Sequence, residues 1–436
     1  MTKKSGLRTG LLPGLPRRKF LAGLGAAGVL PLLSTYAKAA APRVIVIGAG
    51  FGGATCAKYI KMLDPGIDVT LIERSDSYAT CPFSNLVLGG LRPFDSIVHS
   101  YQALRTRWGI NLIHDTATAV DGQARTVTLA SGTTLPYDRL VLSPGIELLW
   151  NAIPGYDEAA AEIMPHGWKA GPQTLLLQKQ LASIENGAKI VITAPDNPYR
   201  CPPAPYERAS MMAHYLKTKG KFGIKIIILD TKDKFTKQDL FLQAWQRFYP
   251  GVIEWVSGSQ GGEVTSVDPK SMTVTAKAGS FKAALANIVP PQSAGQIAIQ
   301  AGVAKIDGWC EIEPWAMESK NVPGIHVIGD ACMPGAMPKS GFAANSQAKN
   351  CAAAVAALVR DRKPTEPVFM NTCYSTIAPN YAVSVVEVFR AASNDVIAVV
   401  MGAGGQSPMN VPDSFRSAEY DYAQGWYAST MQEMFG

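Results

Sequence analysis

A strand, a glycine-rich turn and a helix near the N-terminus constrain the fold most strongly. The β-branched apolar run 43–47 predicts a buried parallel strand, and it leads directly into the glycine spacing G-x-G-x-x-G over residues 48–53. A helical stretch continues to about residue 63, and a second apolar strand, 68–72, ends at Glu73. This order predicts a Rossmann-type site for an adenine dinucleotide.

Each part of this unit has a physical role. Gly48 allows the tight turn, Gly50 lets the backbone approach a pyrophosphate, and Gly53 lets helix and strand pack closely. The helix N-terminus offers free N–H groups to the phosphates. Glu73, with Arg74 beside it, stands where an acid accepts hydrogen bonds from a ribose. A structural glycine turn would explain an isolated motif, but not strand, glycines, helix and acid in register.

Two later segments favour FAD over NAD at this site. Residues 137–145 form a strand that ends in a small-residue turn, and residues 324–331 form another that ends in Gly-Asp. Both resemble the two-dinucleotide-domain flavoproteins of the disulfide reductase superfamily. That resemblance implies that Asp330 holds the ribityl chain and that a helix at about 345–359 points its N-terminus at the flavin. The predicted FAD site therefore also includes Ser143, Gly145, Asp330, Lys339, Ser340 and Gly341.

A second Rossmann unit is predicted without its nicotinamide site. The matching strand, 189–193, is followed by a proline-rich segment, 194–203, that has no glycine fingerprint. Prolines block close backbone approach and remove N–H donors. The next strand, 225–229, still ends in Asp230. We therefore expect a retained fold that takes electrons from a directly reacting substrate.

Three cysteine segments narrow the resemblance. Residues 78–85, 199–210 and 371–375 resemble the flavoprotein subunit of flavocytochrome c sulfide dehydrogenase, and the likeness runs over essentially the whole chain after the leader. It implies that Cys81 bonds the flavin through its 8α carbon. It also implies that Cys201 and Cys373 form a redox-active disulfide against the flavin ring.

The chemistry of these groups agrees with that resemblance. A disulfide is an electrophile that HS⁻ attacks, giving a persulfide and a free thiolate. A flavin then divides the electron pair into the single-electron steps that a haem requires. Without the resemblance, Cys201 and Cys373 would be interpreted as an inert structural bridge, and Cys81 as a buried thiol. Which of the two cysteines meets sulfide first stays open. Glu207 and Lys339 are candidate proton handlers or flavin neighbours, or else members of ordinary ion pairs.

Seven cysteines leave at least one that is free, linked to another chain or bonded to a cofactor. The other four, Cys56, Cys310, Cys332 and Cys351, are interpreted as small core residues. There is no C-x-x-C-H haem motif and no zinc-type cluster of cysteine and histidine, so we expect no metal on this chain.

The N-terminus has the layout of a signal peptide. Arg17 and Arg18 precede a short apolar run, and 37–39 forms an A-x-A exit, as in the twin-arginine type. The run is shorter than the ~20 residues that a membrane span needs. Residues 1–39 carry seven basic residues and no acid, which leaves 34 bases and 34 acids in the remaining chain. The composition therefore gives no evidence for nucleic-acid binding, and a periplasmic location is expected.

These observations predict an α/β fold in three parts after the leader. An FAD domain is expected over 41–155 and 290–363, a second Rossmann-like domain over 156–289, and a C-terminal interface domain over 364–436. The favoured function is oxidation of sulfide with electrons passed to a separate c-type cytochrome subunit, in a heterodimer. The alternatives are a sulfide:quinone oxidoreductase, a pyridine-nucleotide disulfide reductase, and a non-catalytic FAD-binding assembly module.

Overall fold

The computed structural model describes residues 40–392 and 396–436 of the chain. Its first sheet has five strands in the order β20-β9-β1-β2-β5, and every pairing is parallel. The strands are short, rich in β-branched residues and largely buried, as in sheets covered on both faces. Their bounds are β1 Arg43–Ile47, β2 Asp68–Ile72, β5 Asn111–Ile113, β9 Arg139–Leu142 and β20 Ile325–Val327.

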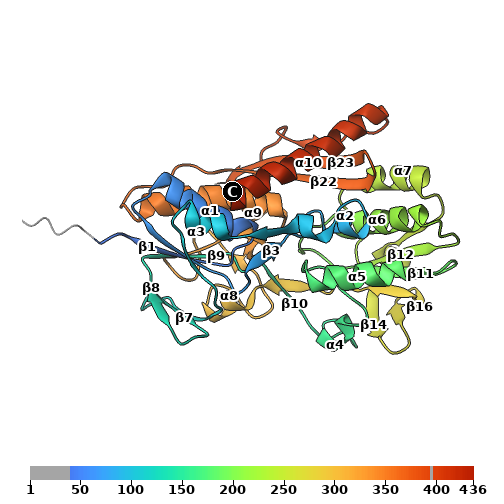
Figure 1. Ribbon diagram of the computed structural model, residues 1–436, viewed down its shortest axis with the longest axis horizontal. Coiled ribbons are helices and arrows are strands. Elements are labelled where there is room, and N and C mark those ends of the chain that lie inside the picture. Colours follow the sequence, from blue (N-terminus) through green and yellow to red (C-terminus); the bar gives the residue numbers. More distant parts are fainter. Residues whose placement is uncertain (1–39, 393–395) are drawn as a thin grey trace, which may run out of the picture. The chain divides into compact units, whose positions relative to one another are not determined.

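Helices α1 (Phe51–Leu63) and α9 (Gly341–Leu358) pack against each other beside this sheet (Figure 1). The buried face of α9 is mostly alanine, which lets the two helices approach closely. The helix that was expected from about residue 345 begins at Gly341, because the Ser340 hydroxyl accepts the N–H of Ala343 and caps it there.

The second sheet is also parallel, with the order β13-β12-β11-β17. Helix α6 packs against β11 and β12, and the stretch that joins β11 to α6 is the proline-rich segment. A three-stranded antiparallel sheet, β14-β15-β16, is inserted before β17. The bounds are β11 Lys189–Ala194, β12 Lys225–Asp230, β13 Ile253–Val256, β14 Val264–Asp268, β15 Thr273–Ala276, β16 Gly279–Lys282, β17 Leu285–Asn287, α5 Pro172–Ala182, α6 Ala204–Thr218 and α7 Gln238–Phe248.

Small elements complete the region between and beside the sheets. Strands β10 and β18 pair antiparallel, as do β3 with β4, and β6, β7 and β8 form a separate meander. The bounds are β3 Ser77–Ala79, α2 Ser84–Leu88, β4 Val98–Ser100, α3 Gln102–Thr106, β6 Ala117–Asp121, β7 Thr126–Leu129, β8 Thr134–Pro136, β10 Ile146–Leu148, α4 Glu158–Ala161, β18 Gln292–Ala294, α8 Gln296–Gln300, β19 Cys310–Glu311 and β21 Cys332–Met333.

A long hairpin and a long helix form the C-terminal part. Strands β22 (Val368–Ala378) and β23 (Tyr381–Ala391) pair along most of their length, with β24 (Ile397–Val399) and β25 (Gly405–Gln406) at the outer edge. Strand β22 contacts α9 at one end and α6 and α7 at the other, so it spans the helices of both sheets (Figure 1). Helix α10 (Asp413–Phe435) lies across β23.

The mixed α/β fold with two Rossmann-like sheets is confirmed. Residues Ala41–Gly436 pack as one compact unit, and the predicted division into three domains stays a prediction. The predicted leader, 1–39, lies outside the described residues. Among the helices of the described chain, none combines the length and the apolar character that crossing a bilayer requires.

Candidate active site

The glycine-rich turn after β1 forms one wall of a large cleft. Gly48 has a φ of +90°, and a Cβ there would lie 2.4 Å from the carbonyl oxygen of Ser143. A Cβ on Gly53 would lie 1.7 Å from the Gly48 oxygen, so only glycine allows α1 to pack this closely on the turn. Gly50 precedes α1 without a side-chain cap, which leaves the first N–H groups of the helix available for an anion.

Most of the other predicted cofactor residues line the same cleft, whose empty volume, with open solvent included, is about 2370 Å³. The Glu73 carboxylate accepts the Ala49 N–H at 2.9 Å, which ties the second strand to the glycine turn. The residues of the prediction that line the cleft are Gly48, Gly50, Glu73, Arg74, Cys81, Ser143, Gly145, Asp330 and Gly341.

Asp330 is the feature that best fits a bound dinucleotide. It follows β20, and its Oδ1 is buried without a hydrogen-bond partner in the described structure. Loss of hydration raises the pKa of this carboxyl, while the guanidinium of Arg200, 4.0 Å away, opposes the rise. A buried acceptor without a donor is costly. A sugar hydroxyl of FAD would supply that donor, so the residues present fit the cofactor.

Three predicted residues do not line the cleft. Gly53 lies beneath the turn, where it serves packing. Lys339 is absent from the cleft lining: its Nζ donates to the carbonyl oxygens of Asp330 (2.9 Å) and Cys332 (2.5 Å), and its ammonium lies 3.6 Å from the Trp309 ring centre. Ser340 caps α9 and lines the adjoining pocket described next. Lys339 therefore holds the loop after Asp330.

Cys81, Cys201 and Cys373 line one pocket, although they are far apart in the sequence, and its empty volume, with open solvent included, is about 770 Å³. Cys81 precedes α2, Cys201 precedes α6 and Cys373 lies in the middle of β22. Cys81 and Cys201 also line the dinucleotide cleft, so the pocket and the cleft adjoin. All three are unbonded thiols in this structure, and the disulfide of Cys201 and Cys373 stays a prediction.

The backbone at Cys201 is held in an unusual conformation. Its φ is +57°, in the left-handed region that residues with side chains rarely adopt. Its N–H donates to the carbonyl oxygen of Lys339 at 2.8 Å, which ties the proline-rich segment to the loop before α9. Loss of hydration is the main cause that raises the pKa of the Cys201 thiol well above its ordinary value.

Buried cations surround the pocket. Arg208 is 3% exposed and pairs with no carboxylate in the described structure. Its guanidinium donates to carbonyl and amide oxygens of His166, Gly167, Asn85 and Asn287.

Among the residues that line the pocket, Glu207 is the acid. It accepts the Asn85 amide and the Thr376 N–H, each at 2.8 Å, and loss of hydration raises the pKa of its carboxyl.

Aromatic rings close the pocket on the side of α10. The Trp426 ring stacks near Phe342 (5.9 Å between centres) and Phe51 (6.5 Å), and Tyr374 lies 6.4 Å away. Sequence reasoning placed no role on Trp426, although the aromatic content of the tail was a signal. Arg208 was not predicted as a site residue, although it lies inside the cysteine segment 199–210. Lys237 was not predicted either, and it lies outside the three cysteine segments.

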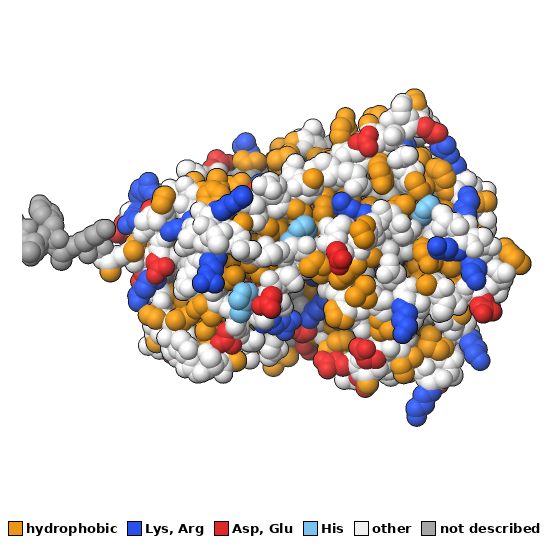
Figure 2. All heavy atoms as spheres, in the orientation of Figure 1, with side chains coloured by type: hydrophobic (Ala, Val, Ile, Leu, Met, Phe, Trp, Pro, Cys, Tyr) orange, Lys and Arg blue, Asp and Glu red, His pale blue; other side chains and the backbone are white. Residues whose placement is uncertain are grey.

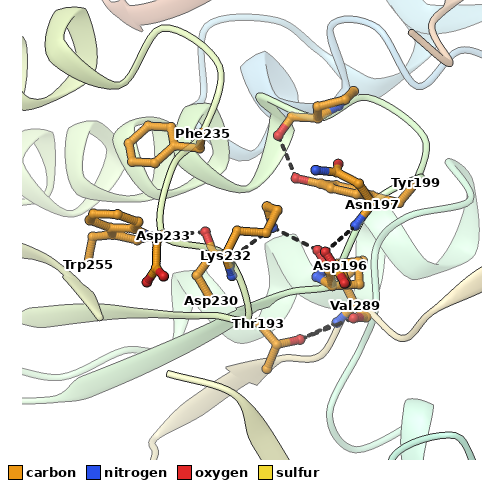
Figure 3. A network of polar contacts seen from close by, with 12 residues as sticks. Thr193, Asp196, Asn197, Tyr199, Asp230, Lys232, Asp233, Phe235, Trp255 and Val289 are labelled. Atoms are coloured by element: carbon orange, nitrogen blue, oxygen red, sulfur yellow. Dashed lines mark hydrogen bonds and ion pairs between the residues drawn. The ribbon is translucent and has the colours of Figure 1, made fainter. Parts of the chain in front are cut away.

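The corresponding edge of the second sheet is filled by side chains (Figure 3). Asp230, at the end of β12, is fully buried; it accepts the Tyr206 hydroxyl, the Trp255 indole N–H (3.0 Å) and the Lys232 ammonium (2.6 Å). Phe235 stacks on Tyr206 with 3.7 Å between ring centres. The acid that would hold a nicotinamide-cofactor ribose is thus already bonded within the protein, in agreement with the missing glycine fingerprint.

Comparisons with known proteins place the chain in a family. Residues 174–290 match the family model described as the central part of the sulfide dehydrogenase [flavocytochrome c] flavoprotein chain. Residues 365–435 match its flavin-binding part, and 42–192 match the pyridine nucleotide-disulphide oxidoreductase model.

Individual relatives agree with these matches. The sulfide dehydrogenase [flavocytochrome c] flavoprotein chain of Chlorobaculum thiosulfatiphilum is 60% identical over 45 residues, which are 10% of this chain and 94% of the relative. The sulfide-quinone reductase of Aquifex aeolicus is 32% identical over 182 residues, so the match spans only 40% of that relative and 41% of this chain. The solved sulfide:quinone oxidoreductase of that bacterium has the same fold, with a TM-score of 0.69 at 19% identity, over 90% of this chain and 92% of the other. The chain therefore belongs to the flavoprotein-chain family of flavocytochrome c sulfide dehydrogenase, an FAD-dependent group of oxidoreductases with the pyridine nucleotide-disulphide oxidoreductase fold.

Proposed function

We propose that this protein oxidises sulfide to sulfur or polysulfide through a Cys201–Cys373 disulfide and bound FAD, and passes the electrons to a c-type cytochrome subunit. The observation that carries the proposal is the pocket in which both cysteines meet, beside the dinucleotide cleft. Because both cysteines line this pocket, a substrate sulfur bound there would be next to both thiols and to a cofactor in the cleft.

The chain's own residues prepare this pocket for an anionic sulfur nucleophile. The buried guanidinium of Arg208, which lines the pocket and has no carboxylate partner among the described residues, favours an anion there. HS⁻ attacks one sulfur of the disulfide and the other sulfur leaves as a thiolate. Glu207 holds a proton to a higher pH than an exposed carboxyl would, so it suits proton transfer beside the two thiols. FAD, when bound, accepts two electrons and releases them one at a time.

A thioether between Cys81 and the flavin belongs to the same proposal. Cys81 lies where the pocket and the cleft adjoin, and its thiol donates to the carbonyl oxygen of Trp168 at 3.3 Å. A covalent bond would retain the flavin after export. The export itself, by the twin-arginine pathway to the periplasm, is proposed from the leader alone.

The C-terminal part is the proposed docking region for the cytochrome subunit, in a heterodimer. Trp426 lies at the pocket, and Tyr422, one helical turn earlier on α10, is 63% exposed. Figure 2 shows apolar side chains over α10 and β23, mixed with charged ones. The exposed apolar residues of this part are Val368, Met370, Val396, Val399, Met401, Met409, Phe415 and Tyr422. Apolar side chains with a charged surround are typical of a protein contact.

Anaerobic titration with sulfide tests the proposal. We expect sulfide to bleach the flavin absorbance of the purified holoprotein. Cys201→Ala and Cys373→Ala should each abolish bleaching while flavin stays bound. Cys351→Ala, a buried control on α9, should still be bleached by sulfide. Flavin that stays oxidised in excess sulfide would contradict the proposal and would favour the alternative of a non-catalytic FAD-binding assembly module.

A quinone is the second candidate for the electron acceptor, because the chain also matches a sulfide-quinone reductase. The two acceptors are separated by reoxidation of the sulfide-reduced protein with a c-type cytochrome or with a short-chain quinone. Faster reoxidation by the cytochrome supports the proposal, and faster reoxidation by the quinone replaces it. Reduction of the flavin by NADH would instead favour a pyridine-nucleotide disulfide reductase.

A further inference from the structure

A buried lysine behind Cys373 has no part in the function described so far. Lys237 is 1% exposed and precedes α7 with φ +65° and ψ +27°, in the left-handed region. This conformation is uncommon for a residue with a side chain and persists where the surrounding structure requires it. It turns the side chain from the start of α7 toward β22.

In the described structure the hydrogen bonds of Lys237 go to neutral groups, and its charge also acts on the Glu207 carboxyl, whose pKa it lowers. Its Nζ donates to the carbonyl oxygen of Cys373 and to the hydroxyl of Ser375, each at 2.8 Å. Both acceptors are neutral, and Lys237 takes part in none of the ion pairs found among residues 40–392 and 396–436. A buried ammonium without a counter-ion is costly. The site therefore favours an anion close to Cys373, and the Glu207 carboxyl and the Cys373 sulfur are the acidic groups on which the charge of Lys237 acts.

The two thiols of the pocket differ in their charged neighbours. Loss of hydration raises the pKa of Cys373, Lys237 opposes that rise, and the Glu207 carboxyl adds to it. Loss of hydration also raises the pKa of Cys201, and there Cys373, Glu207 and Cys81 add to the rise while Arg200 opposes it. The Arg200 charge is shared, because its guanidinium donates to the Trp168 carbonyl and faces Asp330.

We propose that Lys237 is the counter-cation of the Cys373 thiolate and thereby directs the attack of HS⁻ to the sulfur of Cys201. This inference rests on the proposed function. In the step, a sulfur–sulfur bond forms between HS⁻ and Cys201, and the Cys201–Cys373 bond breaks. Its electron pair goes to the Cys373 sulfur, so one negative charge enters and one remains. The thiol that is the better-stabilised anion leaves faster. Lys237 acts through Cys373 and is thus a positioning residue.

Thiol alkylation measures this charge effect without sulfide. The reduced holoprotein is treated with iodoacetamide between pH 5 and 9, and the modification of each cysteine is followed by peptide mass spectrometry. Lys237→Met should lower the alkylation rate of Cys373 about tenfold at pH 7, the change that a one-unit rise in pKa produces, and move its pH profile upward. The rate at Cys201 should change less than threefold.

Two variants control for structure. Lys237→Arg retains the positive charge and should keep the Cys373 profile near that of the unchanged protein. Ser375→Ala removes one hydrogen-bond partner but no charge and should keep it within twofold. An unchanged Cys373 profile in Lys237→Met overturns the proposal, and so does an equal slowing of both cysteines.

A second measurement on the unchanged protein decides the case even if Lys237→Met does not fold. The oxidised holoprotein receives one equivalent of sulfide, is trapped with iodoacetamide, and is searched for the peptide with one added sulfur atom. Added sulfur on Cys201 supports the proposal, and added sulfur on Cys373 overturns it. Sulfide that neither adds nor bleaches the flavin contradicts the proposed function instead, and the alkylation profiles then decide the role of Lys237 separately.

Discussion

Each of the two parallel sheets has an aspartate at the carboxyl end of a strand, and the two aspartates differ in their hydrogen bonding. Asp330 follows β20 in the first sheet, lines an open cleft, and keeps a buried oxygen that has no partner within residues 40–392 and 396–436. Asp230 ends β12 in the second sheet and is bonded by Tyr206, Trp255 and Lys232. Glu73, at the end of β2, holds the position in the first sheet that Asp230 holds in the second, and it accepts the Ala49 N–H and still lines the cleft. The comparison teaches that what distinguishes the two sheets is the open cleft beside the glycine turn and the free oxygen of Asp330, and not whether the acid is bonded within the protein.

The largest expected effect tests the open turn of the first sheet. In Gly53→Ala the new methyl group would lie 1.7 Å from the Gly48 oxygen, a backbone atom that cannot move without displacing the turn. We expect purified protein without flavin, or no folded protein, as judged by flavin absorbance and circular dichroism. Gly425→Ala, on α10 with open space around it, is the helical control and should bind flavin normally. A flavin-replete Gly53→Ala protein would show that the turn is not the cofactor site.

The next effect tests the filled edge of the second sheet. Asp230→Asn removes the charge that Lys232 faces in a buried pair, and should lower the free energy of unfolding by about 3 kcal/mol. Flavin binding should stay unchanged, and we expect NADH to reduce the flavin of neither protein. Urea denaturation followed by tryptophan fluorescence measures the loss, with the exposed Glu254→Gln on β13 as the control. A variant as stable as the unchanged protein would mean that Asp230 has no structural role.

A pH effect of intermediate size tests how the second region holds its buried polar groups. His166 is buried, its Nδ1 accepts the Trp168 N–H at 2.8 Å, and loss of hydration lowers its pKa to about 3. Below pH 6.5 the unfolded chain binds a proton at this residue that the folded protein does not bind until about pH 3. Stability should therefore fall with decreasing pH, by on the order of 3 kcal/mol between pH 6.5 and 4.

His166→Asn keeps an acceptor and should remove this part of the pH dependence. Urea midpoints between pH 4 and 7 measure it, and His114→Asn, at a more exposed site, should leave the dependence unchanged. Parallel pH curves for His166→Asn and the unchanged protein would contradict the assignment.

The smallest expected effect compares the two aspartates directly. Asp330→Asn should weaken FAD binding about tenfold, since a hydrogen bond to a charged acceptor contributes about 1.5–3 kcal/mol and the amide retains part of it. The measurement is fluorescence titration of the apoprotein in a Cys81→Ala background, where a covalent bond cannot mask the affinity. Asp230→Asn in the same background should bind FAD unchanged. Equal affinities for all three proteins would remove Asp330 from the cofactor site.

Local sequence patterns predicted the parts of the site whose geometry is local. The turn at Gly48, the packing of Gly53 and the placement of Glu73 depend on residues within one strand–helix–strand unit, so spacing alone was sufficient. The helix after Asp330 was expected four residues too late, because the pattern of alanines does not show that Ser340 caps it. Lys339 was expected beside the flavin, but its ammonium donates to the carbonyl oxygens of Asp330 and Cys332 in the loop that precedes it.

The sequence by itself determined the α/β class, the first dinucleotide turn and the absence of the second one. Only the tertiary structure decided that cysteines from a loop, a second loop and a hairpin strand share one pocket, and that Lys237 lies behind one of them. The physical reason is the distance along the chain over which the interactions act. Turns, caps and strand periodicity depend on neighbours along the chain, whereas the charge and hydration of a buried thiol depend on side chains that are brought together only when β22 packs across both sheets.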